Sequence, residues 1–247
     1  EPRQGKSFAL NTGIAAARGE IIAFTDDDVR PAKDWLERLL EIYDSHHAAA
    51  VGGRVVLAGN KRMPEWLHPE LMLFLGLKDM GNEVMVVRPP DALVGANMSA
   101  RASVARRVGG FRTDLGPRGR NPSVAYNEDS DFCSRVHALK DHGEVLYTPH
   151  AVTYHAMMPE KLTRHFFRQR ARGEGKAAAR LSPPRSKSQL VYLTLALSFR
   201  SLSAGLGWLK RTGRPGEQFL REFRLTQEWS TLFYMWRGAW SRATVGT

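Results

Sequence analysis

The sequence contains a single cysteine, Cys133, among 247 residues. An intrachain disulfide needs two cysteines, so the class of small secreted domains held together by disulfides is excluded. Acidic residues are also few: 25 Asp and Glu stand against 36 Lys and Arg, which gives a formal net charge of +11. This balance predicts an anionic partner, such as a nucleic acid, an acidic membrane surface or a phosphate-bearing substrate.

The first residues lack both an initiator methionine and the apolar segment of a signal peptide. Residues 1–6 read instead as a loop within a domain, so we expect the catalytic domain to begin upstream of them. The chain also has no internal repeat and no low-complexity tract. With 43% hydrophobic residues it can bury a real core, and one catalytic domain with an appendage fits its length.

The first two thirds of the chain alternate between helical and strand patterns. Apolar residues at helical spacing predict helices over 8–18, 31–43, 103–108 and 126–139. Short apolar runs predict strands over 20–25, 49–58, 144–148 and 151–155, the last two separated by Pro149. The second helix is expected to bury Trp35, Leu36, Leu39, Leu40 and Tyr43. Residues 59–90 read as a loop with a short helix. The alternation predicts an α/β fold in which helices flank a sheet.

After Met158 the composition becomes basic and rich in aromatic residues. We expect a basic helix over 161–181, a break at Ser182-Pro183-Pro184-Arg185-Ser186, and further helices over 189–209 and 217–240. The chain is therefore divided into a partial catalytic domain, 1–157, and a basic, amphipathic helical region, 158–247.

Residues 189–209 are long enough to span a bilayer, which takes about 20 apolar residues. Arg200 in the middle of the segment disfavours a spanning helix, so a helix lying in the membrane interface suits the composition better. The alternative, left open, is that the C-terminal helices pack on the catalytic domain or on a second subunit.

Three consecutive carboxylates, Asp26, Asp27 and Asp28, follow the strand predicted over 20–25. Open α/β sheets bind ligands at the carboxyl ends of their strands. Adjacent carboxylates repel one another unless a cation lies near, so Mg²⁺ or Mn²⁺ is the natural neutraliser. A solvated acidic turn in front of the following helix is the simpler alternative.

A second acidic cluster, Glu128, Asp129 and Asp131, opens the helix predicted over 126–139. The helix dipole favours acidic residues there, but capping alone accounts for only one or two of them. Asp131 and Arg135, four residues apart, are expected to pair. Glu128 or Asp129 is then left to face a cleft, where a carboxylate can accept a proton from a substrate hydroxyl.

His155 ends the last predicted strand. A lone histidine is more often a packing or surface residue than a ligand. Beside two carboxylates, however, an imidazole suits Mn²⁺ or a similar ion. His150 is the less favoured competitor.

The order of these motifs resembles glycosyltransferase family 2, a family of inverting enzymes with the GT-A fold. The matching segments are GKSFALN (5–11), IIAFTDDDVRP (21–31), WL (35–36), GANM (95–98), VGGF (108–111), NEDSDF (127–132) with Arg135, and YTP (147–149) with His155. Together they cover roughly the first two thirds of the chain. The resemblance implies a GT-A-like, Rossmann-related mixed sheet whose first β-α units precede Glu1.

The resemblance also implies roles for individual residues. Asp26 and Asp28 match the family's DxD pair, which implies both as metal ligands. Asp28 is implied as the direct ligand, Asp26 lies nearer the ribose, and Asp27 is grouped with the substrate-binding residues. Asp129 matches the general base, with Glu128 beside it. His155 matches a histidine that binds metal in some members.

Two further segments match the family's substrate-binding motifs. Gly95, Ala96 and Asn97 match a segment that lines the donor and acceptor pocket. Gln169 and Arg172 keep the spacing of the QxxRW motif, which implies a diphosphate contact for Arg172. Gly173 stands in place of the tryptophan, so processive polymer synthesis is not supported.

We therefore expect a metal-dependent, inverting transfer of a sugar from a nucleotide-diphosphate donor to a hydroxyl acceptor, with Mg²⁺ or Mn²⁺ as cofactor. The acceptor is expected to be lipid-linked or a saccharide. The basic tail predicts an anionic membrane partner, at the cytoplasmic face of the cell membrane.

Two alternatives remain open on the sequence. A metal-dependent phosphoryl-transfer or nuclease-type enzyme uses similar carboxylates. A non-catalytic basic module that binds membranes or nucleic acid also fits the charge. No recognised nucleic-acid motif is present in the sequence, so nucleic acid is not the expected partner.

Overall fold

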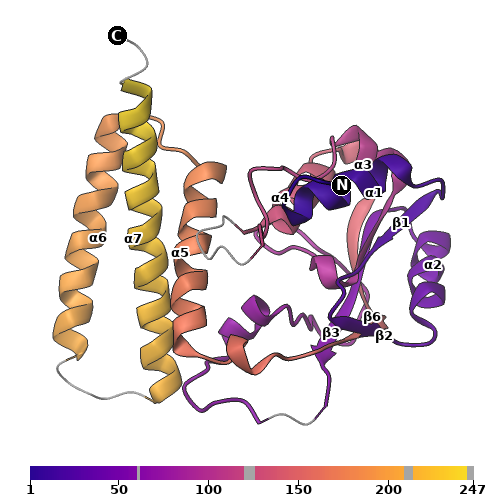
Figure 1. The fold of residues 1–247 in the computed structure, drawn as a ribbon, viewed down its shortest axis with the longest axis horizontal. Coiled ribbons are helices and arrows are strands. Elements are labelled where there is room, and N and C mark those ends of the chain that lie inside the picture. The colour runs from indigo at the N-terminus through magenta and orange to yellow at the C-terminus, as the bar shows by residue number, and fades with distance from the viewer. Residues whose placement is uncertain (60–61, 120–125, 209–213, 244–247) are drawn as a thin grey trace. The chain divides into compact units, whose positions relative to one another are not determined.

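The computed structural model describes residues 1–59, 62–119, 126–208 and 214–243 (Figure 1). The chain forms two compact units, a sheet unit and a helical unit. The sheet unit comprises Glu1–Arg62, Met72–Gly119 and Asn127–Pro159. The helical unit comprises Met63–Leu71, Arg120–Tyr126 and Glu160–Thr247.

A six-stranded mixed sheet organises the sheet unit. Its strands lie in the order β1 (Ile21–Phe24), β5 (Met98–Arg101), β3 (Ala48–Leu57), β6 (Glu144–His155) and β2 (Val29–Pro31), and β4 (Met85–Val86) also pairs with β6. The pair β3–β6 is parallel and the other pairs are antiparallel. The predicted mixed α/β sheet is thus confirmed.

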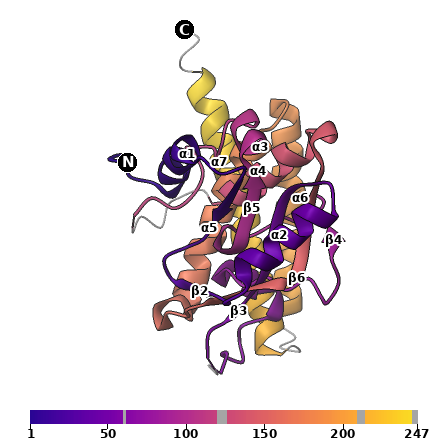
Figure 2. The ribbon, with the colours of Figure 1, turned by 90° about the vertical axis from the view of Figure 1, so that its right-hand side faces the viewer.

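Helices cover both faces of this sheet. Helices α1 (Lys6–Ala16), α3 (Ala102–Arg107) and α4 (Glu128–His137) bury apolar residues against one face. In that core, the rings of Phe111 and Phe132 stack with centroids 4.5 Å apart. Helix α2 (Trp35–Ser45) lies on the other face, in front of the sheet in Figure 2. The two layers together shield the central strands from water.

Helix α2 buries a narrower stripe than the sequence predicts. Trp35, Leu39 and Tyr43 are buried, but Leu36 and Leu40 are 55% and 48% exposed. The buried residues recur every three to four positions, so one side of the helix faces the sheet, whereas Leu36 and Leu40 lie beyond that side. The expectation that these two leucines are buried is wrong.

The two strands predicted on either side of Pro149 are one strand, β6. Its pairing with β3 shifts register between Gly53 and Arg54, which pair with Thr148 and Val152. The three residues 149–151 therefore bulge out of the ladder, and the bulge accommodates a proline that has no N–H to donate. The expected break is thus a bulge.

The remaining elements of the sheet unit and its borders are short. The 3₁₀ segments are η1 (Pro69–Leu75), η2 (Gly95–Asn97), η3 (Lys140–His142) and η4 (Pro159–Lys161). Strands β2, β4 and β5 were not predicted. Pro31 was expected to open a helix but lies in β2 at the edge of the sheet, where a missing N–H is tolerated, and α2 begins at Trp35.

Three helices dominate the helical unit: α5 (Arg164–Leu181), α6 (Lys187–Trp208) and α7 (Pro215–Ala243). They lie side by side, with α7 between α5 and α6 (Figure 1). Gly175 permits a close approach, because a Cβ there would lie 2.4 Å from the carbonyl oxygen of Gln227 on α7. Within the described residues, no helix has an apolar stretch long enough to cross a membrane.

Candidate active site

Strand register brings the acidic loop and the Gly95-Ala96-Asn97 segment together. Phe24, the last residue of β1, pairs with Met98, the first residue of β5. The loop that leaves β1 and the segment that enters β5 are therefore neighbours, and the hydroxyl of Thr25 donates to the carbonyl of Ala96 at 3.3 Å. Two sequence motifs about 70 positions apart thus share one end of the sheet.

The pairing of β2 with β6 places Asp28 beside His155. Val29 pairs with His155, and the backbone N–H of Ala156 donates to the carbonyl of Asp28 at 2.8 Å. As a result, Oδ1 of Asp28 lies 3.5 Å from Nε2 of His155. The imidazole is 4% exposed. Two of the predicted metal ligands therefore meet.

The tautomer of His155 favours a cation between these two side chains. Nδ1 of the ring lies 3.0 Å from the carbonyl oxygen of Ala156, which only accepts hydrogen bonds. The proton is therefore assigned to Nδ1, and Nε2 presents a lone pair toward the Asp28 carboxylate. Two facing electron-pair donors are stable with a proton or a metal ion between them.

The third predicted metal ligand, Asp26, is not part of this pair. Its Oδ1 is 2.6 Å from Nζ of Lys6. In the part of the chain that the structure describes, no group of three His, Cys, Asp or Glu side chains is arranged to hold a metal. Mg²⁺ and Mn²⁺ commonly use one or two protein ligands and complete their shell with water and substrate phosphates. Asp28 and His155 fit such a cation.

Lys6 is a site residue that the sequence analysis missed. Its Nζ lies near both acidic clusters, 2.6 Å from Asp26 and 3.9 Å from Oε1 of Glu128. Burial disfavours the charged ammonium, but the negative charges of Asp26, Glu128 and Asp129 outweigh it, and the pKa of Lys6 is raised. A sequence signal did exist, since Lys6 lies in the GKSFALN segment (5–11) that carries the family resemblance, but the predicted helix begins at residue 8 whereas α1 begins at Lys6.

The second acidic cluster borders the same segment. Oδ1 of Asp129 accepts the N–H of Ser130 at 2.8 Å, and Oδ2 accepts the N–H of Gly95 at 3.3 Å. Glu128 beside it is 7% exposed. The predicted pair within the helix is confirmed, since Arg135 Nη2 lies 2.6 Å from Asp131 Oδ2. Asp131 is thus engaged in an ion pair with Arg135, whereas the Asp129 carboxylate is oriented by two backbone N–H groups.

Asn97 does not present its side chain to a ligand. It is fully buried, and its Oδ1 accepts the indole N–H of Trp35 at 2.8 Å. Its amide group donates to the carbonyls of Arg54 and Ala151, at 3.0 and 2.8 Å. Because both amide protons are used inside the fold, the Asn97 side chain positions this segment, and the predicted contact with substrate is left to its backbone.

The other predicted site residues differ in their exposure. Ala96 is 1% exposed, so only its backbone is available, whereas Gly95 is half-buried. Asp27 is exposed in the loop, and His150 is exposed on the β6 bulge, away from the pairing of His155 with Asp28. Arg172 is exposed on α5, in the helical unit.

Parts of the chain are similar to known glycosyltransferases. Residues 1–98 match the family model "Glycosyl transferase family 2". The chain is 29% identical over 161 residues to a glucosyl-dolichyl phosphate glucuronosyltransferase of Haloferax volcanii, covering 64% of this chain and 49% of the relative. It is 30% identical over 159 residues to a pre-mycofactocin glycosyltransferase of Mycobacterium tuberculosis, covering 62% of this chain and 30% of the relative.

A solved structure supports the fold. The mannosyltransferase PcManGT from Pyrobaculum calidifontis, in complex with GDP-Man and Mn²⁺, superposes with a TM-score of 0.51 at 19% identity. The match covers 94% of this chain and 66% of that one. The chain thus spans about half the length, or less, of the curated relatives named above. The first 98 residues of the chain therefore resemble glycosyl transferase family 2, and the chain has a fold similar to that of the mannosyltransferase.

Proposed function

We propose that this protein transfers a sugar from a nucleotide-diphosphate donor to a hydroxyl acceptor, with inversion and with the help of a divalent metal. The observation that most supports the proposal is the pair Asp28 and His155, whose donor atoms face each other at 3.5 Å. Asp28 lies at the end of the acidic loop that also contains Asp26. The chemistry is assigned to residues 1–157.

The metal and the acidic loop act on the donor. Asp28 and His155 would hold Mg²⁺ or Mn²⁺, which supplies Lewis-acid stabilisation to the diphosphate leaving group. Asp26 would contact the ribose, and its neighbour Asp27 would serve the donor from the exposed side of the loop. Lys6 holds Asp26 at 2.6 Å, so the carboxylate keeps its orientation before the donor arrives.

Asp129 acts on the acceptor. Two backbone N–H groups, from Ser130 and Gly95, fix the direction of its carboxylate. The acceptor oxygen attacks the anomeric carbon while the bond from that carbon to the diphosphate breaks, and the hydroxyl proton passes to Asp129. A single displacement of this kind inverts the anomeric centre and needs no covalent enzyme intermediate. Glu128 lies beside Asp129 as a second carboxylate.

Substitution of the two key carboxylates tests this proposal. Asp28→Asn and Asp129→Asn should each reduce sugar transfer, measured as released nucleoside diphosphate with glycosylated acceptor, by about 100-fold or more. Asp44→Asn, the same change at an exposed position of α2, is the matched control and should leave transfer unchanged. Mn²⁺ binding, followed by electron paramagnetic resonance, should weaken in Asp28→Asn and persist in Asp129→Asn. Near-normal transfer in either variant contradicts the role assigned to that residue.

We further propose a lipid-linked acceptor and an anionic membrane partner at the cytoplasmic face of the cell membrane. The first relative is named for a glucosyl-dolichyl phosphate substrate. Helix α6 exposes Tyr192, Leu195 and Phe199, which are 70%, 66% and 75% accessible and are spaced to lie on one side of the helix. Residues 187–208 contain no Asp or Glu. An apolar face without acidic residues suits the surface of an anionic bilayer.

Vesicle flotation tests the membrane contact. The chain should float with anionic vesicles and less with neutral ones, and the triple variant Tyr192→Ser, Leu195→Ser, Phe199→Ser should stay in solution. The double variant Leu36→Ser, Leu40→Ser, which removes exposed leucines from α2, is the control and should float like the wild type. A wild-type chain that stays in solution with anionic vesicles refutes the membrane contact.

A further inference from the structure

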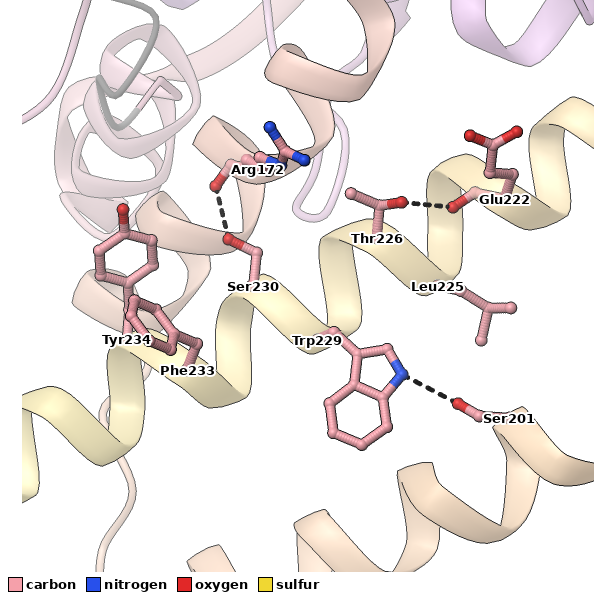
Figure 3. Close-up of a pocket in the computed structure, with 9 residues that line it drawn as sticks. All are labelled: Arg172, Ser201, Glu222, Leu225, Thr226, Trp229, Ser230, Phe233 and Tyr234. Carbon is pink, nitrogen blue, oxygen red and sulfur yellow. Dashed lines mark hydrogen bonds between the residues drawn. The ribbon is translucent and has the colours of Figure 1, made fainter.

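An open groove of about 660 Å³ follows helix α7 in the helical unit (Figure 3). Its lining comes from three helices: Arg172 of α5, Ser201 of α6, and Glu222, Leu225, Thr226, Trp229, Ser230, Phe233 and Tyr234 of α7. Its size is that of a small-molecule pocket, for which about 300–1,000 Å³ is usual. Apart from the diphosphate contact that the sequence resemblance implies for Arg172, nothing in the sugar-transfer chemistry above uses this groove.

The walls of the groove offer apolar surface. Trp229 and Phe233 are 42% and 56% exposed, a costly arrangement for large aromatic side chains in water. The indole N–H of Trp229 donates to the hydroxyl of Ser201 at 3.0 Å (Figure 3). The one polar group of the indole is therefore satisfied, and its ring, with the side chain of Leu225, presents hydrocarbon to the groove.

Two of the hydroxyl groups along the groove, those of Ser230 and Thr226, are also engaged. Ser230 donates to the carbonyl of Arg172 at 2.8 Å, and Thr226 donates to the carbonyl of Glu222 at 2.8 Å (Figure 3). Neither hydroxyl proton is left for a ligand. Recognition of a sugar, which needs many hydrogen-bonding partners, is therefore disfavoured, and an apolar chain suits the walls better.

The charge at the edge of the groove is positive. The carboxylate of Glu222 pairs with the guanidinium of Arg168. Arg172 is exposed and has no ion-pair partner among the residues that the structure describes. Lys176, one turn along α5, places its ammonium 5.4 Å from the centroid of the Tyr234 ring. An unpaired guanidinium beside apolar walls fits a ligand that joins an anionic head to a hydrocarbon chain.

We infer that this groove binds the lipid of the acceptor: the hydrocarbon chain of a polyprenyl phosphate lies against Leu225, Trp229 and Phe233, and its phosphate binds Arg172. The inference rests on the proposed lipid-linked acceptor. It assigns the lipid to one face of the helical unit, distinct from the exposed face of α6 that is proposed to contact the bilayer.

Binding of a fluorescent long-chain polyprenyl phosphate in detergent micelles, measured by anisotropy without donor or metal, tests the inference. Arg172→Gln should weaken binding of the phosphate by about tenfold, the effect of losing one charged hydrogen-bonding partner. The same variant should bind the uncharged polyprenol as the wild type does. Arg221→Gln, at an exposed arginine of α7 outside the groove, is the matched control and should bind both lipids normally.

A second variant tests the apolar wall. Phe233→Ser removes a ring that is 56% exposed, so folding is retained, and it should weaken binding of both the phosphate and the alcohol. Leu195→Ser, on the proposed bilayer face, should leave micellar binding intact. The inference is overturned if Arg172→Gln and Phe233→Ser bind the polyprenyl phosphate like the wild type. It is also overturned if inorganic phosphate, or vesicles of ordinary anionic phospholipid, displace the probe as well as unlabelled polyprenyl phosphate does.

The same measurements separate this inference from the proposed function. A chain that binds polyprenyl phosphate through Arg172 but transfers no sugar supports the groove and contradicts the proposed chemistry. Conversely, the chain could transfer sugar to a water-soluble acceptor while its lipid binding does not depend on Arg172. That result supports the proposed chemistry and overturns the assignment of the groove.

Discussion

The ammonium group of Lys6 lies 2.6 Å from the carboxylate of Asp26 and links the start of α1 to the acidic loop after β1. Glu128, from the second acidic cluster, lies 3.9 Å from the same ammonium. A cation of the protein therefore neutralises part of the charge that the two clusters bring together. The pair formed by Asp28 and His155 is the site proposed above for a divalent cation.

Lys6→Met should destabilise the sheet unit by about 1–3 kcal/mol at neutral pH, because partly buried carboxylates lose their counter-charge. The pKa of Lys6 is raised above its ordinary value of 10.5 in the folded state. The stability that Lys6 contributes is therefore fully present below pH 10.5. It is lost as the pH rises through the folded-state pKa. Denaturant unfolding of both proteins across this range should show their stabilities converging at high pH. Lys33→Met, at an exposed lysine, should have little effect, and equal stability of Lys6→Met and the wild type at neutral pH would contradict the role of Lys6.

Asn97→Ala should lower the free energy of unfolding by about 2–4 kcal/mol, because it leaves the indole of Trp35 and two buried carbonyls without partners. Trp35→Phe removes only one of these hydrogen bonds and should lower the free energy of unfolding by a smaller amount. Asn82→Ala is the control, since Asn82 accepts a hydrogen bond from Arg54 at an exposed site. Thermal unfolding measures all three. An Asn97→Ala protein as stable as the wild type would argue that Asn97 serves a ligand instead.

Gly53→Ala should destabilise the protein by more than about 3 kcal/mol, because the new methyl group would lie 1.9 Å from the carbonyl oxygen of Ala151 in the β6 bulge. Gly13→Ala, on an exposed position of α1 with no atom within 4 Å, should stabilise it by about 0.5–1 kcal/mol through helix propensity. Equilibrium unfolding in denaturant compares the two. The two substitutions are expected to change the free energy of unfolding in opposite directions. A Gly53→Ala protein as stable as the wild type would contradict the close packing of Gly53 against the β6 bulge.

Cys133 should react with thiol reagents only after unfolding. The side chain is buried, and burial raises the pKa of the thiol to about 12, so the reactive thiolate is scarce at neutral pH. The rate of labelling by a disulfide reagent should therefore follow the unfolded fraction as denaturant is added. Fast labelling of the native protein would show that Cys133 is accessible.

Local features of this protein could be predicted from the sequence. The pair Asp131 and Arg135 depends only on the geometry of one helix, in which residues four apart lie on the same side. The break at 182–186 follows from consecutive prolines, which cannot continue a helix. The acidic loop was identified because the strand before it and the carboxylates within it are adjacent in the chain.

The partners of the site residues were decided by strand register. Asp28 meets His155 because Val29 pairs with it across β2 and β6, and β2 is too short to be seen in the sequence. Asn97 is buried because β5 and the β6 bulge both approach it, 54 residues from Ala151 in the chain. Pro149 does not end β6, because residues 149–151 bulge out of the pairing with β3 and no ladder hydrogen bond is needed from the proline.

The amino-acid order by itself determined the motifs that resemble glycosyltransferase family 2, the alternation of helices and strands, and the two acidic clusters, since each depends on residues close together in the chain. Only the tertiary structure decided which carboxylate faces His155, which is held by Lys6, and whether Asn97 serves the core or a ligand. Such pairings depend on how distant strands align, and a shift of one residue in register would exchange the buried and exposed side chains of an entire strand.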